Sequence, residues 1–165
     1  MNGIEFYKGL SAGINNLLNY KNKLDEINVF PVPDGDTGTN MCFTLLPIVE
    51  DCNDKITKNI GESLNIIADL ALESARGNSG TIIAQFIHGM RIEIRGKDRI
   101  SINNFSDALI SGYDSAIESL MNPEEGTIIT VMRDVANKSK KLFEENPDIN
   151  FEIFLDKCYQ ESVES

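Results

Sequence analysis

The sequence contains few of the side chains on which metal centres and nucleophilic catalysis most often depend. Its 165 residues include one histidine, no tryptophan and three cysteines, none of them in a CxxC pair. This composition excludes zinc-finger spacing and an HExxH helix. The odd number and wide spacing of Cys42, Cys52 and Cys158 are typical of free, reduced thiols. His88 stands in the run TIIAQFIHGM, where helical spacing favours a packed or half-exposed side chain over a catalytic one.

Positive charge is also scarce. Fifteen basic residues against 26 acidic ones give a net charge of −11. Such a surface repels phosphate backbones and anionic lipids, so we expect no nucleic acid or membrane partner. No apolar run approaches the roughly 20 residues of a membrane span. The first residues lack the features of a signal peptide, so we expect a cytoplasmic protein. The length suits one domain over residues 1–165.

Apolar residues recur every three or four positions along most of the chain, which predicts an all-α fold of about seven amphipathic helices. Thr39 and Ser79 are candidate N-caps, and Pro47 is expected to bend or end its helix. The segment Ile92–Ile102 fits either a hairpin around GKD or a frayed helix end with a loop. The expected helices cover residues 4–24, 40–46, 60–75, 80–90, 106–121, 127–145 and 151–163.

Two glycine-bearing loops, each before a predicted helix, are candidates for chemistry. In the first, Asp34 and Asp36 supply hard oxygen ligands for Mg²⁺ or Ca²⁺. Thr37, Thr39 and Asn40 add neutral ligands or phosphate donors. In the second, Ala75–Gly80, glycines let backbone N–H groups approach an anion at a helix N-terminus, and Arg76 adds a bidentate contact. Together the loops predict a metal–polyphosphate site, in which the cation reverses the local negative charge.

Each loop also fits an ordinary structure: an Asx-turn with surface acids, and a glycine turn before a helix. An EF-hand is excluded, because Thr39 and Leu45 stand where that loop needs glycine and glutamate. The chain contains no Walker A tripeptide and no GxGxxG. Arg91, Arg95, Lys97 and Arg99 form a basic cluster, which fits either partner docking or nucleotide steering, or a solvated loop with local salt pairs.

The stretch Asn28–Met41, NVFPVPDGDTGTNM, closely resembles the nucleotide-binding domain of bacterial fatty acid kinase, a domain similar to the L subunit of dihydroxyacetone kinase (DhaL). Three further stretches resemble the same family, in the same order: Lys58–Glu62, Ala75–Gly80 and Pro123–Met132. The resemblance implies a barrel or bundle of about seven to eight amphipathic helices, with ATP and two Mg²⁺ ions at one open end.

The resemblance also assigns residues by position. Asp34 and Asp36 correspond to metal ligands, and Thr37, Gly38, Thr39 and Asn40 to a phosphate loop. The second phosphate loop corresponds to Arg76, Gly77, Asn78 and Ser79, and the adenine pocket to Gly126, Thr127 and Ile128. A third family aspartate has no counterpart at the matching spacing. Asn28 is the nearest oxygen-bearing side chain, so it or a water is expected as the third ligand, while Asp25 lies further back.

The family continues past this point with another helix and an Asp-Ser-Gly-Gly-type segment. We therefore expect residues 1–165 to form a DhaL-like domain truncated at its C-terminus and lacking the last family helix. The implied activity is Mg-ATP-dependent phosphoryl transfer to a fatty acid carboxylate held by a separate DegV-like protein. That carboxylate is already ionised at neutral pH and needs no general base. The alternatives are a non-catalytic metal- or nucleotide-binding docking module and a dihydroxyacetone (glycerone) kinase L-type subunit.

Overall fold

The computed structural model describes residues 1–29 and 33–165 and confirms the all-α fold class. Within these residues there are seven α-helices, one short 3₁₀ helix (η1) and no strand. No helix among them is both long and apolar enough to cross a bilayer. The elements are α1 Gly3–Glu26, α2 Thr37–Asp51, η1 Asn53–Lys55, α3 Ile60–Glu73, α4 Gly77–Ile94, α5 Ile102–Glu118, α6 Ile128–Glu145 and α7 Phe151–Glu164.

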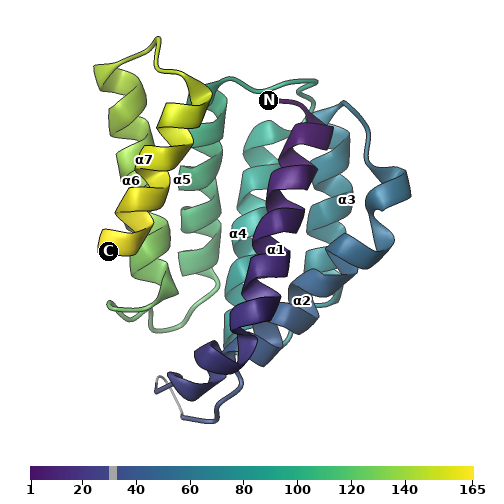
Figure 1. The fold of residues 1–165 in the computed structure, drawn as a ribbon, viewed down its shortest axis with the longest axis vertical. Coiled ribbons are helices and arrows are strands. Elements are labelled where there is room, and N and C mark those ends of the chain that lie inside the picture. Colours follow the sequence, from purple (N-terminus) through teal and green to yellow (C-terminus); the bar gives the residue numbers. More distant parts are fainter. Residues whose placement is uncertain (30–32) are drawn as a thin grey trace.

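The helices run up and down, so that alternate connections meet at the same end (Figure 1). Helices α1, α3, α5 and α7 begin at the end that is uppermost in Figure 1, here called the upper end. Helices α2, α4 and α6 begin at the opposite, lower end. Short connections between neighbours favour this antiparallel succession. Both glycine-bearing loops therefore reach the lower end.

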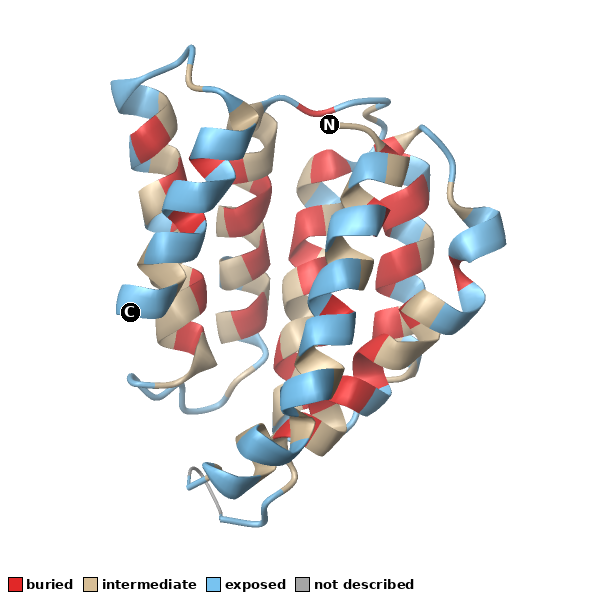
Figure 2. Cartoon of the chain, in the orientation of Figure 1, coloured by how far each residue is buried: buried red, intermediate tan, exposed pale blue. Residues whose placement is uncertain are grey.

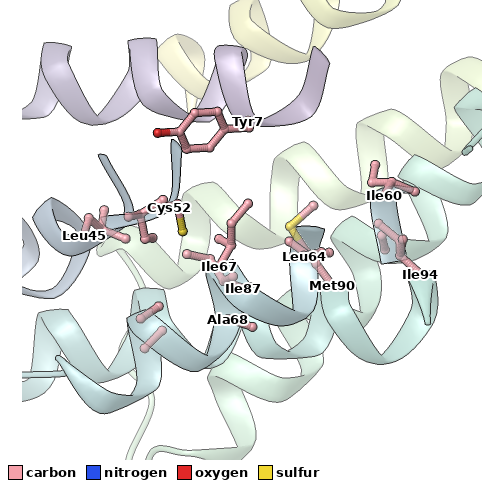
Figure 3. Packing of buried hydrophobic residues seen from close by; sticks show 14 of the residues in the cluster. Tyr7, Leu45, Cys52, Ile60, Leu64, Ile67, Ala68, Ile87, Met90 and Ile94 are labelled. Atoms are coloured by element: carbon pink, nitrogen blue, oxygen red, sulfur yellow. The ribbon is translucent and has the colours of Figure 1, made fainter. Parts of the chain in front are cut away.

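The main core lies between α1, α2, α3, α4 and α5. Ile48, Ile60, Leu64, Ile67 and Ile94 have no exposed surface. Figure 3 shows side chains of α3 and α4 meeting below Tyr7 of α1, and Figure 2 shows that the buried faces of these helices point into the bundle. Burial of each large apolar side chain contributes about 1.5–3 kcal/mol. The core thereby fixes the helices that carry the two loops.

Two smaller clusters extend the core toward α6 and α7. Ile82 of α4 packs with Ala116 of α5 and with Ile129 and Met132 of α6. In the other cluster, Leu142 packs with two side chains of α7. The first cluster joins the start of α6 to the first turns of α4.

Helix α2 differs from its prediction at both ends. It begins at Thr37, with Asp36 as N-cap, and it continues through Pro47 to Asp51. The predicted N-cap, Thr39, lies inside the first turn instead. Proline in a helix interior costs about 3 kcal/mol. The helix continues because the buried Leu45 and Ile48 lie on either side of the proline in the same apolar face.

Helix α4 also begins earlier than predicted. Its first residue is Gly77 and its N-cap is Arg76, so the prediction of Ser79 as N-cap is wrong. The Ser79 hydroxyl donates to the carbonyl of Thr37 at 3.1 Å. The hydroxyl thus ties α4 to α2 rather than capping its own helix.

Of the two interpretations of Ile92–Ile102, the helix end with a loop is confirmed. Helix α4 runs to the fully buried Ile94 and the chain then turns at Gly96, whose φ is +75°. The loop covers the start of α3, where Ile60 N donates to the Asp98 carbonyl at 3.2 Å. The next helix, α5, begins earlier than predicted because Ser101 forms a capping box at its start.

Candidate functional site

The first loop is a turn between α1 and α2 that presents two carboxylates. Asp34 is exposed and Asp36 is half-buried, and between them Gly35 has a φ of +67°. The side-chain oxygen of Asn28 accepts hydrogen bonds from Gly35 N at 3.0 Å and Asp36 N at 3.3 Å. Asn28 therefore holds the turn that separates the two acids. Phe30, Pro31 and Val32, part of the quoted motif, lie outside the described residues.

Asp25 of α1, which lies further back in the sequence, reaches this loop. Its carboxylate accepts hydrogen bonds from Thr39 N at 2.9 Å and from the Thr39 hydroxyl at 2.7 Å. Burial alone would raise the pKa of Asp25, but these bonds, a further one from the Gly38 backbone and the charge of Lys21 outweigh it and lower the pKa. Asp25 is therefore a charged cap on the first turn of α2.

The second loop opens α4 beside α2. Gly77 has a φ of +58°, and the N-cap residue Arg76 makes no side-chain hydrogen bond to the helix it begins. The Arg76 guanidinium lies over the Phe43 ring, 5.9 Å from its centroid. Arg76, Gly77 and Asn78 are exposed. The start of α4 therefore presents backbone N–H groups and a cation to the surface.

The structure brings the two loops together. A Cβ atom at Gly77 would lie closer than 3.0 Å to the Asn40 side chain, and one at Gly80 would come equally close to the Thr44 hydroxyl. The Thr44 hydroxyl also accepts from Arg76 N at 3.2 Å. Helices α2 and α4 therefore begin side by side, and the positive ends of their dipoles point the same way. That arrangement suits an anion such as a phosphate.

The third predicted segment begins α6 at the same lower end (Figure 1). Gly126 has a φ of +76°. Thr127 is the N-cap of α6, and its hydroxyl accepts from Ile129 N at 3.3 Å. Ile128 is half-buried and packs against the cluster that contains Ile82. Ile82 lies one turn after Ser79 in α4. The segment thus packs, through Ile128, on the cluster that contains Ile82 of α4.

The donor set at the first loop suits a hard divalent cation. Neither Asp34 nor Asp36 forms an ion pair with another residue of the described ranges. Carboxylates without an ion-pair partner are hard oxygen ligands of the kind that Mg²⁺ or Ca²⁺ takes. No group of three or more His, Cys, Asp or Glu side chains gathers into a metal cluster within the same residues. A cation at this loop would thus depend on two acids and neutral oxygens.

His88 lies away from this site, whereas Cys42 is buried in α2 near Lys21 and Asp25. His88 is half-exposed in the middle of α4, as predicted, and its Nδ1 lies 2.5 Å from Arg91, which pairs with Asp69. Burial and then the charge of Arg91 lower the pKa of His88. The three cysteines are free and buried, and burial raises the pKa of Cys158 to about 11.

The basic cluster at the upper end is largely paired with acids. Besides Arg91, Lys97 lies 4.0 Å from Glu93 and Arg99 lies 3.8 Å from Glu5. These pairs support the interpretation as a solvated loop with local salt pairs. Because the cluster lies at the end opposite the two loops (Figure 1), it does not face the phosphate-type site.

Comparison with known proteins identifies the family of the chain. The DAK2 domain family matches residues 31–165. Protein YloV of Bacillus subtilis is 39% identical over 149 residues, which are 90% of this chain and 27% of that protein. An uncharacterized protein of Staphylococcus epidermidis, SERP0792, is 34% identical over 166 residues, 100% of this chain and 30% of that protein.

The chain spans less than a third of the length of these curated relatives. The family match itself covers both loops from Asp34 onward and the start of α6. The chain therefore belongs to the DAK2 domain family, a family of nucleotide-binding, kinase-type domains like the L subunit of dihydroxyacetone kinase.

Proposed function

We propose that this chain is the Mg-ATP-binding, phosphoryl-donating domain of a two-component kinase. The observation that carries the proposal is the meeting of two helix N-termini beside two unpaired carboxylates. The start of α4 suits phosphate oxygens, and Asp34 and Asp36 suit the cations that accompany them. Membership of a kinase-type family supports the same interpretation.

Most of the predicted residues would then have a chemical role. Gly77, Asn78 and Ser79 would hold phosphate oxygens through backbone N–H groups, and Arg76 would add a charge-assisted contact. Thr37 and Asn40 would line the gap between the two loops, and Ile128 with its neighbours would contact adenine. Asp34 and Asp36, with Asn28 or a water, would hold up to two Mg²⁺ ions. Bound Mg²⁺ would neutralise charge that develops on the phosphate oxygens during in-line transfer.

The proposed acceptor is the carboxylate of a fatty acid presented by a separate DegV-like protein. Such a carboxylate attacks without losing a proton, so the site would need no general base. Around Asp34, Asp36 and the start of α4, the described residues offer no histidine, the one histidine being in mid-helix. The DAK2 family match favours a second candidate, a dihydroxyacetone kinase L-type subunit, whose hydroxyl acceptor would need a base from its partner.

A thermal melt with and without Mg-ATP tests nucleotide binding. At about 100 times Kd, a ligand stabilises the folded state by roughly 2.7 kcal/mol, which raises the Tm by several degrees. We expect this shift in the wild type and its loss in Asp36→Asn. The matched control, Asp51→Asn, removes the same charge from the other end of α2 and should keep the shift. A wild type without a magnesium-dependent shift would contradict the proposal.

ATP turnover then separates the acceptors. Turnover that depends on a fatty-acid-loaded partner protein supports the fatty acid kinase function, and turnover that depends on dihydroxyacetone and its partner subunit supports the second candidate. Binding of Mg-ATP without turnover in either mixture would support a docking module instead.

A further inference from the structure

The first N–H groups of α2 are capped by a side chain of another helix. Asp36 is the N-cap residue of α2, so Gly38 and Thr39 are its second and third residues. Thr39 donates its backbone N–H group to Asp25 at 2.9 Å, and its hydroxyl donates to the same carboxylate at 2.7 Å. The N–H group of this third residue is one that an N-cap side chain normally binds. Asp25 therefore performs the capping of α2 from the end of α1.

This arrangement leaves Asp36 without its usual partner. An aspartate at the N-cap ordinarily turns its carboxylate back onto the second or third N–H group. Asp36 makes no such hydrogen bond, and Asp25 already occupies the N–H group of the third residue, Thr39. Its carboxylate thus keeps its lone pairs for a group outside the helix.

The packing of α1 against α2 keeps the Asp25 carboxylate within hydrogen-bond distance of Thr39. Gly38 is buried, and a Cβ atom there would lie closer than 3.0 Å to the Lys21 carbonyl. This close approach brings the start of α2 onto the last turns of α1. Lys21 Nζ lies 4.0 Å from the Asp25 carboxylate on its other side, which favours the charged form of Asp25.

We propose that Asp25 is a positioning residue that caps α2 in place of Asp36 and so keeps the Asp36 carboxylate available to a divalent cation. The proposal rests on the proposed function for the presence of that cation with a nucleotide. Asp25 acts through Asp36, since both of its own oxygens receive hydrogen bonds from Thr39.

Binding of Mn²⁺ with ADP, followed by electron paramagnetic resonance, tests this role in the 165-residue chain. In Asp25→Ala, Asp36 turns back to cap α2, and the affinity for Mn²⁺ falls by roughly tenfold or more, as for other supports of metal ligands. Asp25→Asn, which keeps one acceptor oxygen, should fall between the wild type and Asp25→Ala. Glu26→Gln is the matched control: it removes the neighbouring charge, which pairs with Lys23 at 3.7 Å, and should bind like the wild type.

A double mutant separates positioning from direct ligation. If Asp25 works by freeing Asp36, adding Asp25→Ala to Asp36→Asn costs little further affinity. If the two losses multiply, Asp25 binds the cation itself and the proposal is wrong. Wild-type affinity in a folded Asp25→Ala protein overturns it as well.

A crystal structure of the Asp25→Ala variant without any ligand shows whether Asp36 takes over the capping of α2. The proposal expects an Asp36 carboxylate oxygen within hydrogen-bond distance of Thr39 N, and an unchanged Asp36 side chain overturns it. A wild type that fails to bind Mn²⁺ with ADP would count against the proposed function, whereas this structural outcome bears on Asp25 alone.

Discussion

The helices that begin at the two ends of the molecule differ in their N-caps. At the upper end, each of the four described helices that begin there has its own side-chain cap. At the lower end, α6 has such a cap in Thr127, but the N-cap residues of α2 and α4 make no side-chain hydrogen bond to their helices. The upper caps are Asn2, Asn59, Ser101 and Asn150.

Some charged side chains of the loops at the two ends differ in a similar way. Lys97 and Arg99 at the upper end have acidic partners. At the lower end, Asp34, Asp36 and Arg76 have no ion-pair partner within residues 1–29 and 33–165. Because a helix start and a charge are both stabilised when they are partnered, the uncapped start of α4 and the unpaired charges beside it suit a ligand better than they stabilise the fold.

Pushing the two lower loops apart should give the largest effect. In Gly80→Ala, the new Cβ would lie closer than 3.0 Å to the Thr44 hydroxyl and 3.2 Å from the Asn40 carbonyl. Thr44 is fully buried and holds both Asn40 and Arg76, so it has little room to move. We expect a loss of about 1–3 kcal/mol in the free energy of unfolding, measured in urea, together with loss of Mg-ATP binding.

Gly13→Ala is the control for this change. Nothing lies within 4 Å of a Cβ at Gly13, so alanine should raise the free energy of unfolding by about 0.5–1 kcal/mol. Equal effects of the two substitutions would mean that the close approach of α2 and α4 is not required.

Replacing the N-cap residue of one helix at each end tests the comparison with a smaller expected effect. Ser101 accepts from Asn104 N and completes a capping box, so Ser101→Ala should lower the free energy of unfolding by about 1 kcal/mol. Asp36→Ala should lower it by far less, because Asp36 does not cap α2. Urea unfolding of the two variants without nucleotide measures both. A larger loss in Asp36→Ala would show that the lower loop is itself a structural element.

The helices could be predicted because their signal is local and repeated. Ile60, Leu64 and Ile67 recur at helical spacing, and all three are fully buried in α3. Periodicity of this kind indicates which face of a helix is buried, without any knowledge of the residues that pack against that face. The same antiparallel succession brought the two glycine-bearing loops to one end.

The start of α2 could not be predicted in this way, because its cap is not local. Rules for N-caps compare a residue with the next three in the chain, whereas Asp25 reaches Thr39 across 14 positions and through the packing of two helices. The weak sign in the sequence was an aspartate in the last turn of α1, close before the acidic loop. The prediction that Pro47 ends its helix failed for a related reason. Burial of the apolar face around Pro47 outweighs the tendency of proline to break a helix.

The smallest expected effect concerns His88, which belongs to neither end. Burial and then the charge of Arg91 lower its pKa in the folded state, while the unfolded value stays near about 6.5. The unfolded chain thus binds the proton more readily. The stability that depends on neutral His88 is fully present above about pH 6.5 and is lost as the pH falls through the folded pKa. As the chain has one histidine, a single imidazole resonance in NMR reports this pKa directly.

His88→Gln should flatten the decline in stability below about pH 6.5 and leave Mg-ATP binding unchanged. The groups that face His88 are Arg91 on its own helix and Asp69 on α3, and neither touches the two loops. A measured pKa above the ordinary histidine value would mean that Asp69 outweighs burial and Arg91. A change in Mg-ATP binding would instead show that the middle of α4 is coupled to its start. The ligand-binding region would then include the whole of α4 and not only the lower end.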